Sequence, residues 1–263
     1  MTDIAVPGQA ASAPPLPLPF RPALLPLRGR TVAVTGASGA LGTSLLRALH
    51  GHGAELIALT TASEPVALHD GEGRAIPLRN VVWCCGQEQQ LEATLCDVDI
   101  LVINHGVNVY GDRSAAAIER SLEVNALSAW RLLELFLGLE ERPAGTPCRE
   151  VWVNTSEAEL LPALSPLYEI SKRLLGQLLS LRALDQRGAN SCRIRRLVLG
   201  PFRSSLNPYG VMGADFVAGQ VIAQARRGFG LIIVTPNPIP VVLVPLQMGL
   251  RHLYGRLFSR AAA

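Results

Sequence analysis

The stretch Arg30-Thr-Val-Ala-Val-Thr-Gly-Ala-Ser-Gly-Ala-Leu-Gly42 decides the fold. It begins with a short apolar, β-branched run, which is typical of a buried parallel strand. Glycines follow at positions 36, 39 and 42, and a helical apolar pattern runs from Thr43 to His50. A second apolar run then covers Glu55–Leu59. Strand, glycine turn, helix and strand in this order predict a βαβ unit.

The rest of the chain continues this alternation. Five more short strands are predicted at Val81–Cys85, Asp99–Asn104, Glu150–Asn154, Ile194–Leu199 and Leu231–Thr235. The long helices are expected at Arg113–Leu139 and Ser165–Gln186. We therefore predict the α/β class, a Rossmann-like doubly wound parallel sheet of about seven strands with helices on both faces. Ligands of such a sheet bind beyond the carboxyl ends of its strands.

Length and composition set the domain organisation. The chain has 263 residues, of which 49% are hydrophobic and 17% charged, which suits one large domain with a buried core. We expect a flexible, proline-rich segment over residues 1–27, whose prolines interrupt every apolar run and argue against a signal peptide. The domain itself is expected over residues 28–237, and residues 238–263 form an apolar and basic tail.

Charge and cysteine content restrict the partners. The net charge is only +3, but no acidic residue follows Asp215. No aromatic-interleaved basic patch accompanies this asymmetry, so we expect no nucleic acid, and an anionic membrane surface explains it better. Five cysteines without metal-ligand spacing predict no metal site and indicate reduced core thiols in a cytoplasmic protein.

The glycine turn is a candidate cofactor site. Backbone N–H groups of such a turn approach a pyrophosphate at the positive end of the helix dipole. We assign this contact to six positions in and directly after the turn, with the Ser38 hydroxyl as an added donor: Gly36, Ser38, Gly39, Ala40, Leu41 and Gly42. The second strand ends near Thr60 without a carboxylate that would repel a 2′-phosphate. NADP(H) is therefore favoured over NAD(H).

Tyr168 and Lys172 form the candidate catalytic pair. Every one of the 24 Lys and Arg residues except Lys172 is arginine. Lys172 follows Tyr168 by four residues, so both side chains face one side of a helix. A free phenol titrates near pH ~10, and a compact ammonium beside it would lower that pKa. An isolated Tyr-x-x-x-Lys pair is usually an ordinary half-buried tyrosine beside a solvated lysine, but the surrounding motifs favour the catalytic interpretation here.

Two further polar residues accompany this pair. Ser156 follows the strand Glu150–Asn154, which places its hydroxyl at a carboxyl strand end. Asn125 lies among core-facing neighbours inside a predicted helix. It is either a satisfied helix amide or a residue that bends the helix by holding a water.

These motifs together resemble the short-chain dehydrogenase/reductase family over roughly residues 28–235. The resemblance implies that Tyr168 is the general acid/base and that Ser156 polarises the substrate oxygen. It also implies that Lys172 binds the ribose and lowers the phenol pKa, and that Asn125 holds a proton-relay water. The same family pattern adds cofactor contacts at Asn104, His105, Gly106, Tyr168, Lys172, Gly200 and Ser204.

The chain departs from the family pattern at three points. The glycine spacing is that of the family's extended and atypical branches. The aspartate that usually touches adenine is replaced by the Cys85-Gly86 region, and His105 replaces a small or amide residue.

The segments Asp99–Asn108 and Leu161–Pro166 resemble a group of bacterial, largely cyanobacterial, members of the family, some fused to sterol-desaturase or fatty-acid-hydroxylase domains. That likeness implies a lipid-like substrate.

The tail is expected to form a helix over Val241–Phe258 after a proline-rich turn. Its polar residues gather on one side of this helix: Gln247, Arg251, His252, Arg256 and Arg260. Apolar residues occupy the rest: Val244, Leu246, Leu250, Leu253, Leu257 and Phe258. Such a helix fits peripheral contact with a membrane interface, and it equally fits packing against the core or a second subunit of a homo-oligomer.

The sequence thus predicts an oxidoreductase that interconverts a CH–OH group and a carbonyl on a small apolar substrate with NAD(P)(H). The alternative is a non-catalytic, nucleotide-binding, membrane-associated scaffold or redox sensor, and the joint presence of Tyr168 and Lys172 speaks against it. Epimerase or dehydratase chemistry on a nucleotide sugar would need a larger C-terminal part than the apolar residues after Ser204 provide.

Overall fold

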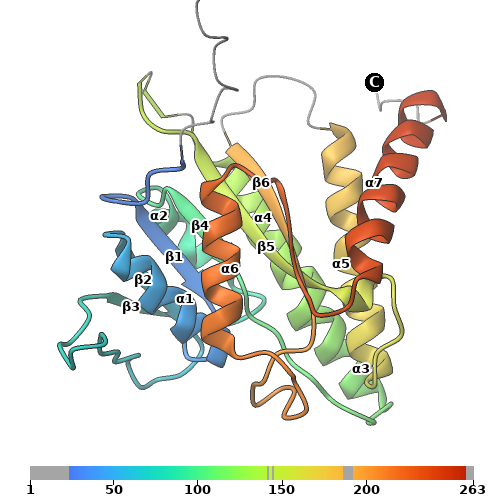
Figure 1. Cartoon of the computed structure of the whole chain (residues 1–263), viewed down its shortest axis with the longest axis horizontal. Coiled ribbons are helices and arrows are strands. Elements are labelled where there is room, and N and C mark those ends of the chain that lie inside the picture. Colours follow the sequence, from blue (N-terminus) through green and yellow to red (C-terminus); the bar gives the residue numbers. More distant parts are fainter. Residues whose placement is uncertain (1–23, 141, 144, 186–191, 259–263) are drawn as a thin grey trace, which may run out of the picture.

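The computed structural model describes residues 24–140, 142–143, 145–185 and 192–258 (Figure 1). Most of the predicted flexible segment, residues 1–23, lies outside this range. Seven strands form one sheet in the order β3-β2-β1-β4-β5-β6-β7, and every neighbouring pair is parallel. The predicted Rossmann-like α/β fold is therefore confirmed.

The elements follow the predicted alternation with small shifts at their ends. The strands are β1 (Thr31–Thr35), β2 (Glu55–Thr60), β3 (Arg79–Val82), β4 (Ile100–Ile103), β5 (Arg149–Ser156), β6 (Cys192–Leu199) and β7 (Leu231–Val234). The helices are α1 (Ala40–Gly51), α2 (Glu92–Leu95), α3 (Ala115–Leu122), α4 (Ser128–Gly138), α5 (Pro166–Asp185), α6 (Ala214–Arg226) and α7 (Ile239–Phe258).

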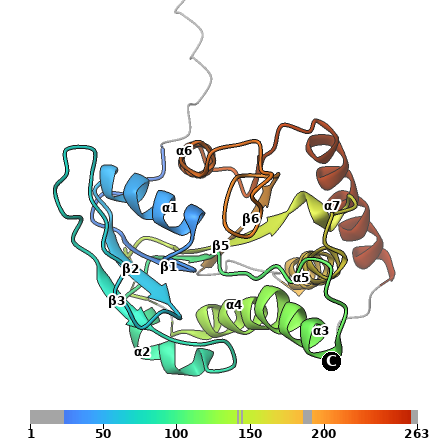
Figure 2. The ribbon, with the colours of Figure 1, turned by 90° about the horizontal axis from the view of Figure 1, so that it is seen from below.

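Both faces of the sheet are covered (Figure 2). Helices α1 and α6 pack on one face, where Val32 and Val34 of β1 point. On the other face, α2, α4 and α5 pack against side chains such as Ala33 of the same strand. This double burial explains why β1 and β4 are continuous apolar runs rather than alternating ones.

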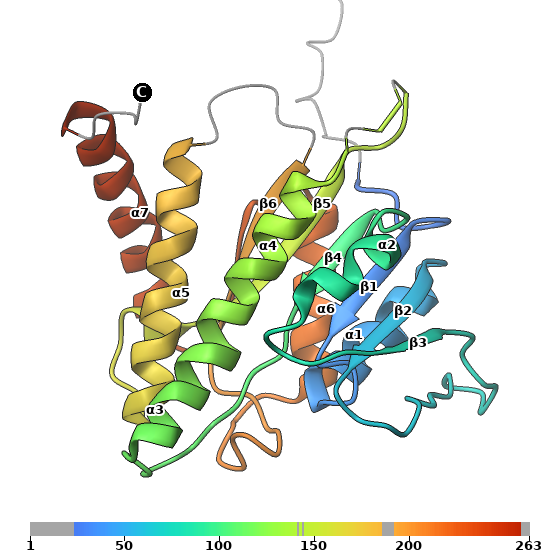
Figure 3. The same ribbon diagram turned by 180° about the vertical axis from the view of Figure 1, so that it is seen from behind.

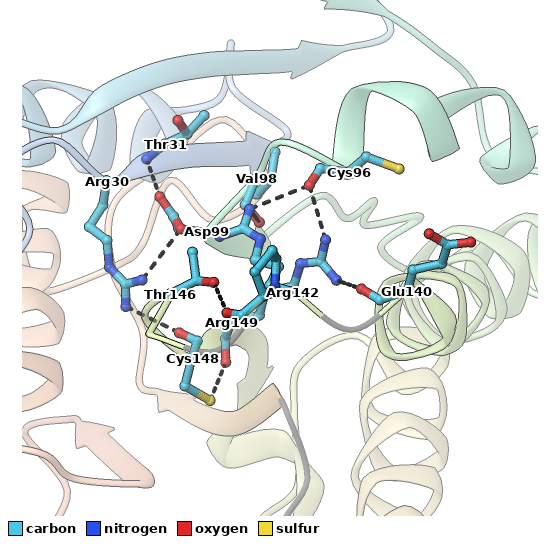
Figure 4. A network of polar contacts seen from close by, with 11 residues as sticks. Arg30, Thr31, Cys96, Val98, Asp99, Glu140, Arg142, Thr146, Cys148 and Arg149 are labelled. Carbon is cyan, nitrogen blue, oxygen red and sulfur yellow. Dashed lines mark hydrogen bonds and ion pairs between the residues drawn. The ribbon is translucent and has the colours of Figure 1, made fainter.

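A polar network closes the amino-terminal edge of the sheet (Figure 4). The Asp99 carboxylate accepts from the Thr31 backbone N–H at 2.8 Å and pairs with Arg30 and Arg142. The Arg149 guanidinium donates to backbone carbonyls at Glu140 and Cys96. These bonds fix the loops at this end, and the opposite, carboxyl-terminal edge carries the ligand cavity.

The long helix predicted over Arg113–Leu139 is interrupted. Between α3 and α4 the segment Glu123–Leu127 forms a π-helical turn, with Asn125 at its centre. A π turn lets side chains inside a helix leave the regular pattern and is often found at functional sites. Figure 3 shows α3 and α4 running along the sheet face beside α5.

The prediction of core thiols is wrong for most cysteines. Cys84, Cys96 and Cys148 are exposed, Cys85 is half-buried, and Cys192 is buried. The exposed three lie in loops or at the ends of elements, away from the two buried faces of the sheet. Among the described residues there is no disulfide and no cluster of potential metal ligands.

The tail helix α7 begins two residues earlier than predicted and packs on α5. Gly255 lies against Leu184, since an added Cβ there would meet that side chain at 2.7 Å. Within the described part of the chain, every helix is too short or too polar to cross a lipid bilayer. Membrane contact and homo-oligomer formation stay predictions.

Candidate active site

A cavity of about 940 Å³ opens at the carboxyl-terminal edge of the sheet. It is lined by the residues that follow β1, β2, β4, β5 and β6, so every chain segment leaving these strands contributes to it. Two loops are tied together over it: the Asn108 amide donates to the Leu206 carbonyl at 3.0 Å, and the Tyr110 hydroxyl donates to the Ser205 carbonyl at 2.9 Å. The cavity is therefore enclosed by loops that hydrogen bonds hold in place.

Most of the predicted site residues meet in this cavity. The lining includes Gly36, Ser38, Gly39, Ala40, Leu41, Thr60, Asn104, His105, Gly106, Ser156, Tyr168, Lys172, Gly200 and Ser204. Gly42 and Asn125 do not line it and lie directly behind its wall. Residues far apart in the sequence are thus brought together as the spacing of motifs predicted.

Tyr168 and Lys172 lie in the first turns of α5 and face the cavity. The Lys172 Nζ is 5.7 Å from the centre of the Tyr168 ring and donates to the Asn154 carbonyl at 3.1 Å. Ser156 ends β5, where its hydroxyl donates to the Leu199 carbonyl at 3.3 Å and accepts from the Ala158 N–H at 3.2 Å. Phenol, ammonium and hydroxyl therefore share one wall of the cavity.

The predicted lowering of the Tyr168 pKa by Lys172 is not what the structure shows. Burial raises the pKa of Tyr168 above its ordinary value of 10.0, and the neighbouring Ser156 hydroxyl offsets only part of the rise. Burial also lowers the pKa of Lys172 to about 8, against the opposing charge of Glu159. Lys172 makes no resolved contribution to the pKa of Tyr168 at this position.

The Asn125 side chain joins the loop at Val107 to helix α5 behind the wall that carries Tyr168. Its Oδ1 accepts from the Val107 N–H at 2.7 Å, and its Nδ2 donates to the Val107 carbonyl at 2.9 Å. The same Nδ2 donates to the Ser171 hydroxyl at 3.0 Å, and that hydroxyl donates to the Tyr168 carbonyl at 2.8 Å. The satisfied-amide alternative describes these contacts, and the predicted relay water stays a prediction.

The glycine turn has the shape that a pyrophosphate requires. Gly36 has a φ of +62°, and a Cβ on it would lie 2.9 Å from the His105 Cα. A Cβ on Gly42 would lie 2.2 Å from the Gly36 carbonyl oxygen. Helix α1 starts directly after the turn, without a side-chain cap and without an acid in its first turn. Its N–H groups and dipole are thus available to an anion.

The end of β2 carries only neutral hydroxyls. Thr60 Oγ1 lies 3.3 Å from Ser38 Oγ and accepts from the Ala62 N–H at 3.1 Å. No carboxylate lies at this strand end among the described lining residues. A ribose with a free 2′-hydroxyl or with a 2′-phosphate would meet hydrogen-bond donors here and no repelling charge.

His105, a predicted cofactor contact, is only partly exposed: its Nδ1 lies 2.9 Å from Thr35 Oγ1, its ring is edge-on to Trp83, and burial lowers its pKa to about 4. Other lining residues, among them Asn154 and Glu157, were not predicted from the sequence. Asn154, which holds Lys172, follows the buried run of β5 and donates from Nδ2 to Asn104 Oδ1 at 2.9 Å. The signal for Asn154 in the sequence was its place at the carboxyl end of β5, two residues before Ser156. Glu157 also lines the cavity, beside Ser156.

Fold and cavity together define a doubly wound dinucleotide-binding domain, with Tyr168, Ser156 and Lys172 lining the cavity at its carboxyl-terminal edge. Comparison with known proteins agrees with this class. Residues 32–158 match the model of the NAD dependent epimerase/dehydratase family. The ketoacyl reductase HetN of Nostoc sp. is 30% identical over 251 residues, which cover 86% of each chain. The chain belongs to the short-chain dehydrogenase/reductase family.

A second relative is more similar in sequence but longer. The monoglucosyldiacylglycerol epimerase of Synechocystis sp. is 48% identical over 236 residues, which are 90% of this chain and 56% of that protein. The chain thus spans little more than half of that relative. Among solved structures, a short-chain dehydrogenase from Sphingobium yanoikuyae in complex with NADPH matches with a TM-score of 0.67 and 16% sequence identity. The match covers 89% of this chain and 98% of that one.

Proposed function

We propose that this domain transfers hydride between NADP(H) and an alcohol/carbonyl pair on a lipid-like substrate, with Tyr168 as the proton-transferring group. The family supports an NAD(P)-dependent oxidoreductase or epimerase rather than the non-catalytic scaffold. The observation that carries the proposal is the shared cavity wall formed by Tyr168, Ser156 and Lys172 beside the glycine turn. NADP(H) is favoured by the uncharged end of β2, and the neighbour from Sphingobium holds NADPH.

The chain's own residues supply the proton and the orientation. The bound nicotinamide supplies or accepts the hydride. In the direction of reduction, the Tyr168 Oη gives its proton to the substrate oxygen as that oxygen gains charge, and oxidation reverses this transfer. The raised pKa of Tyr168 keeps the phenol protonated before the reaction. Ser156 orients the same oxygen, and Lys172 keeps N–H groups for the ribose beyond its bond to Asn154.

Lys172 makes nucleotide binding depend on pH. Its pKa is lowered from 10.5 to about 8, so the ammonium is charged below that pH and neutral above it. We expect the affinity for NADPH to fall as the pH rises through about 8, measured by fluorescence titration. In Lys172→Arg the guanidinium stays charged, so this step is expected to disappear. Equal NADPH affinity of the unmodified protein on both sides of that pH would contradict the role of Lys172.

A second candidate is epimerisation of the sugar of a glycolipid. It is favoured by the 48% identity with monoglucosyldiacylglycerol epimerase. With oxidised nucleotide bound, a ring carbon would give its hydride to the nicotinamide as its hydroxyl loses a proton to the deprotonated form of Tyr168. The same hydride would return to the opposite face of the resulting ketone as Tyr168 gives the proton back, with no net redox change. The sequence argument against a nucleotide-sugar epimerase rested on chain length and does not bear on a lipid-linked sugar. The cavity joins polar Asn108 and Glu157 to apolar Leu164, which suits an amphiphilic molecule.

One assay separates these candidates. The protein is incubated with NADPH or NADP⁺ and, in turn, with long-chain ketones, a β-ketoacyl thioester, monoglucosyldiacylglycerol and a water-soluble nucleotide sugar. Net nicotinamide oxidation with a ketone is expected for a reductase, and an epimerised glycolipid without net change for an epimerase. Turnover of the nucleotide sugar alone, or no hydride transfer by protein that binds NADPH, would overturn the proposal.

A further inference from the structure

The outer face of α7 carries an uninterrupted row of apolar side chains. The helix packs on α5 through a narrow face, where Pro240, Val244 and Gly255 are buried. On the opposite face, large aliphatic residues repeat every three or four positions, and we name them the α7 stripe: Ile239, Leu243, Leu246, Leu250, Leu253 and Leu257. Each is between 40% and 66% exposed, so no described residue covers them.

The apolar surface is wider than the seam of a helix pair. Val242 is 66% exposed beside the α7 stripe, and Tyr254 and Phe258, whose rings are 4.9 Å apart, extend it on the other side. Paired helices bury a narrow seam flanked by charged residues, whereas helices at a lipid interface bury a broad apolar face. A contiguous exposed surface of this size marks an interaction site.

The charge of α7 also favours a lipid surface as the partner of the α7 stripe. Neither α7 nor any other position after Asp215 carries an acidic residue. Arg251 and His252 are exposed and follow the stripe residue Leu250 along the helix. A second copy of α7 would bring no carboxylate to meet them, whereas the headgroups of an anionic bilayer supply opposite charge along the whole helix.

The position of α7 relates this surface to the cavity. The chain passes from β7 into α7 at the carboxyl-terminal edge of the sheet (Figure 1), and there Thr235 Oγ1 donates to Glu157 Oε2 at 2.7 Å. Glu157 lines the cavity beside Ser156. Leu164, which is 95% exposed, lines the cavity as well, so the cavity has an apolar outer part. The stripe therefore begins at the edge of the sheet where the cavity opens.

We propose that α7 lies in the headgroup layer of an anionic bilayer, with the α7 stripe toward the acyl chains, and thereby holds the cavity at the membrane surface. Docking uses no part of the acid–base site. Only its benefit, access to a lipid-borne substrate, rests on the proposed function.

Vesicle flotation tests the docking. We compare the unmodified protein, the double variant Leu246→Glu/Leu253→Glu, and Val82→Glu as a matched control, since Val82 is 61% exposed on the edge strand β3. With vesicles of equal parts phosphatidylcholine and phosphatidylglycerol, the protein and the control are expected to float, and the double variant about tenfold less. Arg251→Glu should also weaken flotation, and pure phosphatidylcholine vesicles should capture less of the unmodified protein.

Three results would overturn the proposal. One is equal flotation of the double variant. Another is no flotation of the unmodified protein. The third is a dimer in sedimentation that the double variant converts to monomer, since a second copy would then cover the stripe. Hydride transfer to a detergent-dispersed substrate is read in parallel and is expected to stay unchanged in the double variant. Failure of the proposed function would remove that activity from every protein, with flotation unaffected.

Discussion

Tyr168→Phe is expected to lower kcat by about three orders of magnitude while leaving the Kd for NADPH within about twofold. In the proposed reaction the phenol gives its proton to the substrate oxygen and takes it back, whereas Ser156, which donates to the Leu199 carbonyl, orients that oxygen and Lys172, which donates to the Asn154 carbonyl, binds the ribose. Removing the Oη leaves the ring and its packing in place, so binding should survive.

The measurement pairs steady-state turnover with NADPH titration, in detergent-dispersed substrate. Tyr254→Phe is the matched control, because this tyrosine lies on α7 and is 67% exposed. It is expected to behave like the unmodified protein. If Tyr168→Phe kept turnover within about tenfold, another group would have to transfer the proton and the assigned chemistry would be wrong.

Gly42→Ala should damage both the fold and the nucleotide site. The added methyl would lie 2.2 Å from the Gly36 carbonyl oxygen and 2.9 Å from the Ala37 Cα, and both are backbone atoms that cannot rotate away. The turn or the start of α1 must therefore shift. We expect the free energy of unfolding to fall by about 2 kcal/mol or more, and NADPH affinity to fall by about a hundredfold.

Gly51→Ala provides the control within the same helix. A Cβ at this position meets nothing within 4 Å, so this variant should be as stable as the unmodified protein or slightly more stable. Urea unfolding and NADPH titration of both variants make the comparison. Unchanged stability and affinity in Gly42→Ala would show that the turn tolerates a side chain and does not approach a phosphate closely.

The fold was predictable because burial on both faces makes strands such as β1 and β4 continuous apolar runs. Ile100–Ile103 and the core of β5 are fully buried, so no polar residue interrupts them. The edge strand β3 was placed two residues late, at Val81–Cys85, since it is only partly buried and its apolar signal continues into the loop at Trp83. The π turn at Asn125 could not be predicted from the sequence, because one additional residue in a helical turn barely changes the spacing of the apolar residues.

The site was predictable as a set of residues and less so as a set of contacts. Lys172 stood out as the single lysine, and its spacing from Tyr168 placed both on one helix face. That its Nζ would bond the Asn154 carbonyl depends on the packing of α5 against β5, which no local pattern records. The raised pKa of Tyr168 has the same origin, because burial is a property of the assembled fold.

Diffraction from crystals soaked with NADPH tests the central claim most directly. We predict density for the pyrophosphate against Gly39 and the first turn of α1, the 2′-phosphate beside Thr60, and the nicotinamide ring within reach of the Tyr168 hydroxyl. Density for the nucleotide outside the cavity, or a nicotinamide ring turned away from Tyr168 with Ser156 and Lys172 pointing elsewhere, would contradict the assignment of this cavity as the active site.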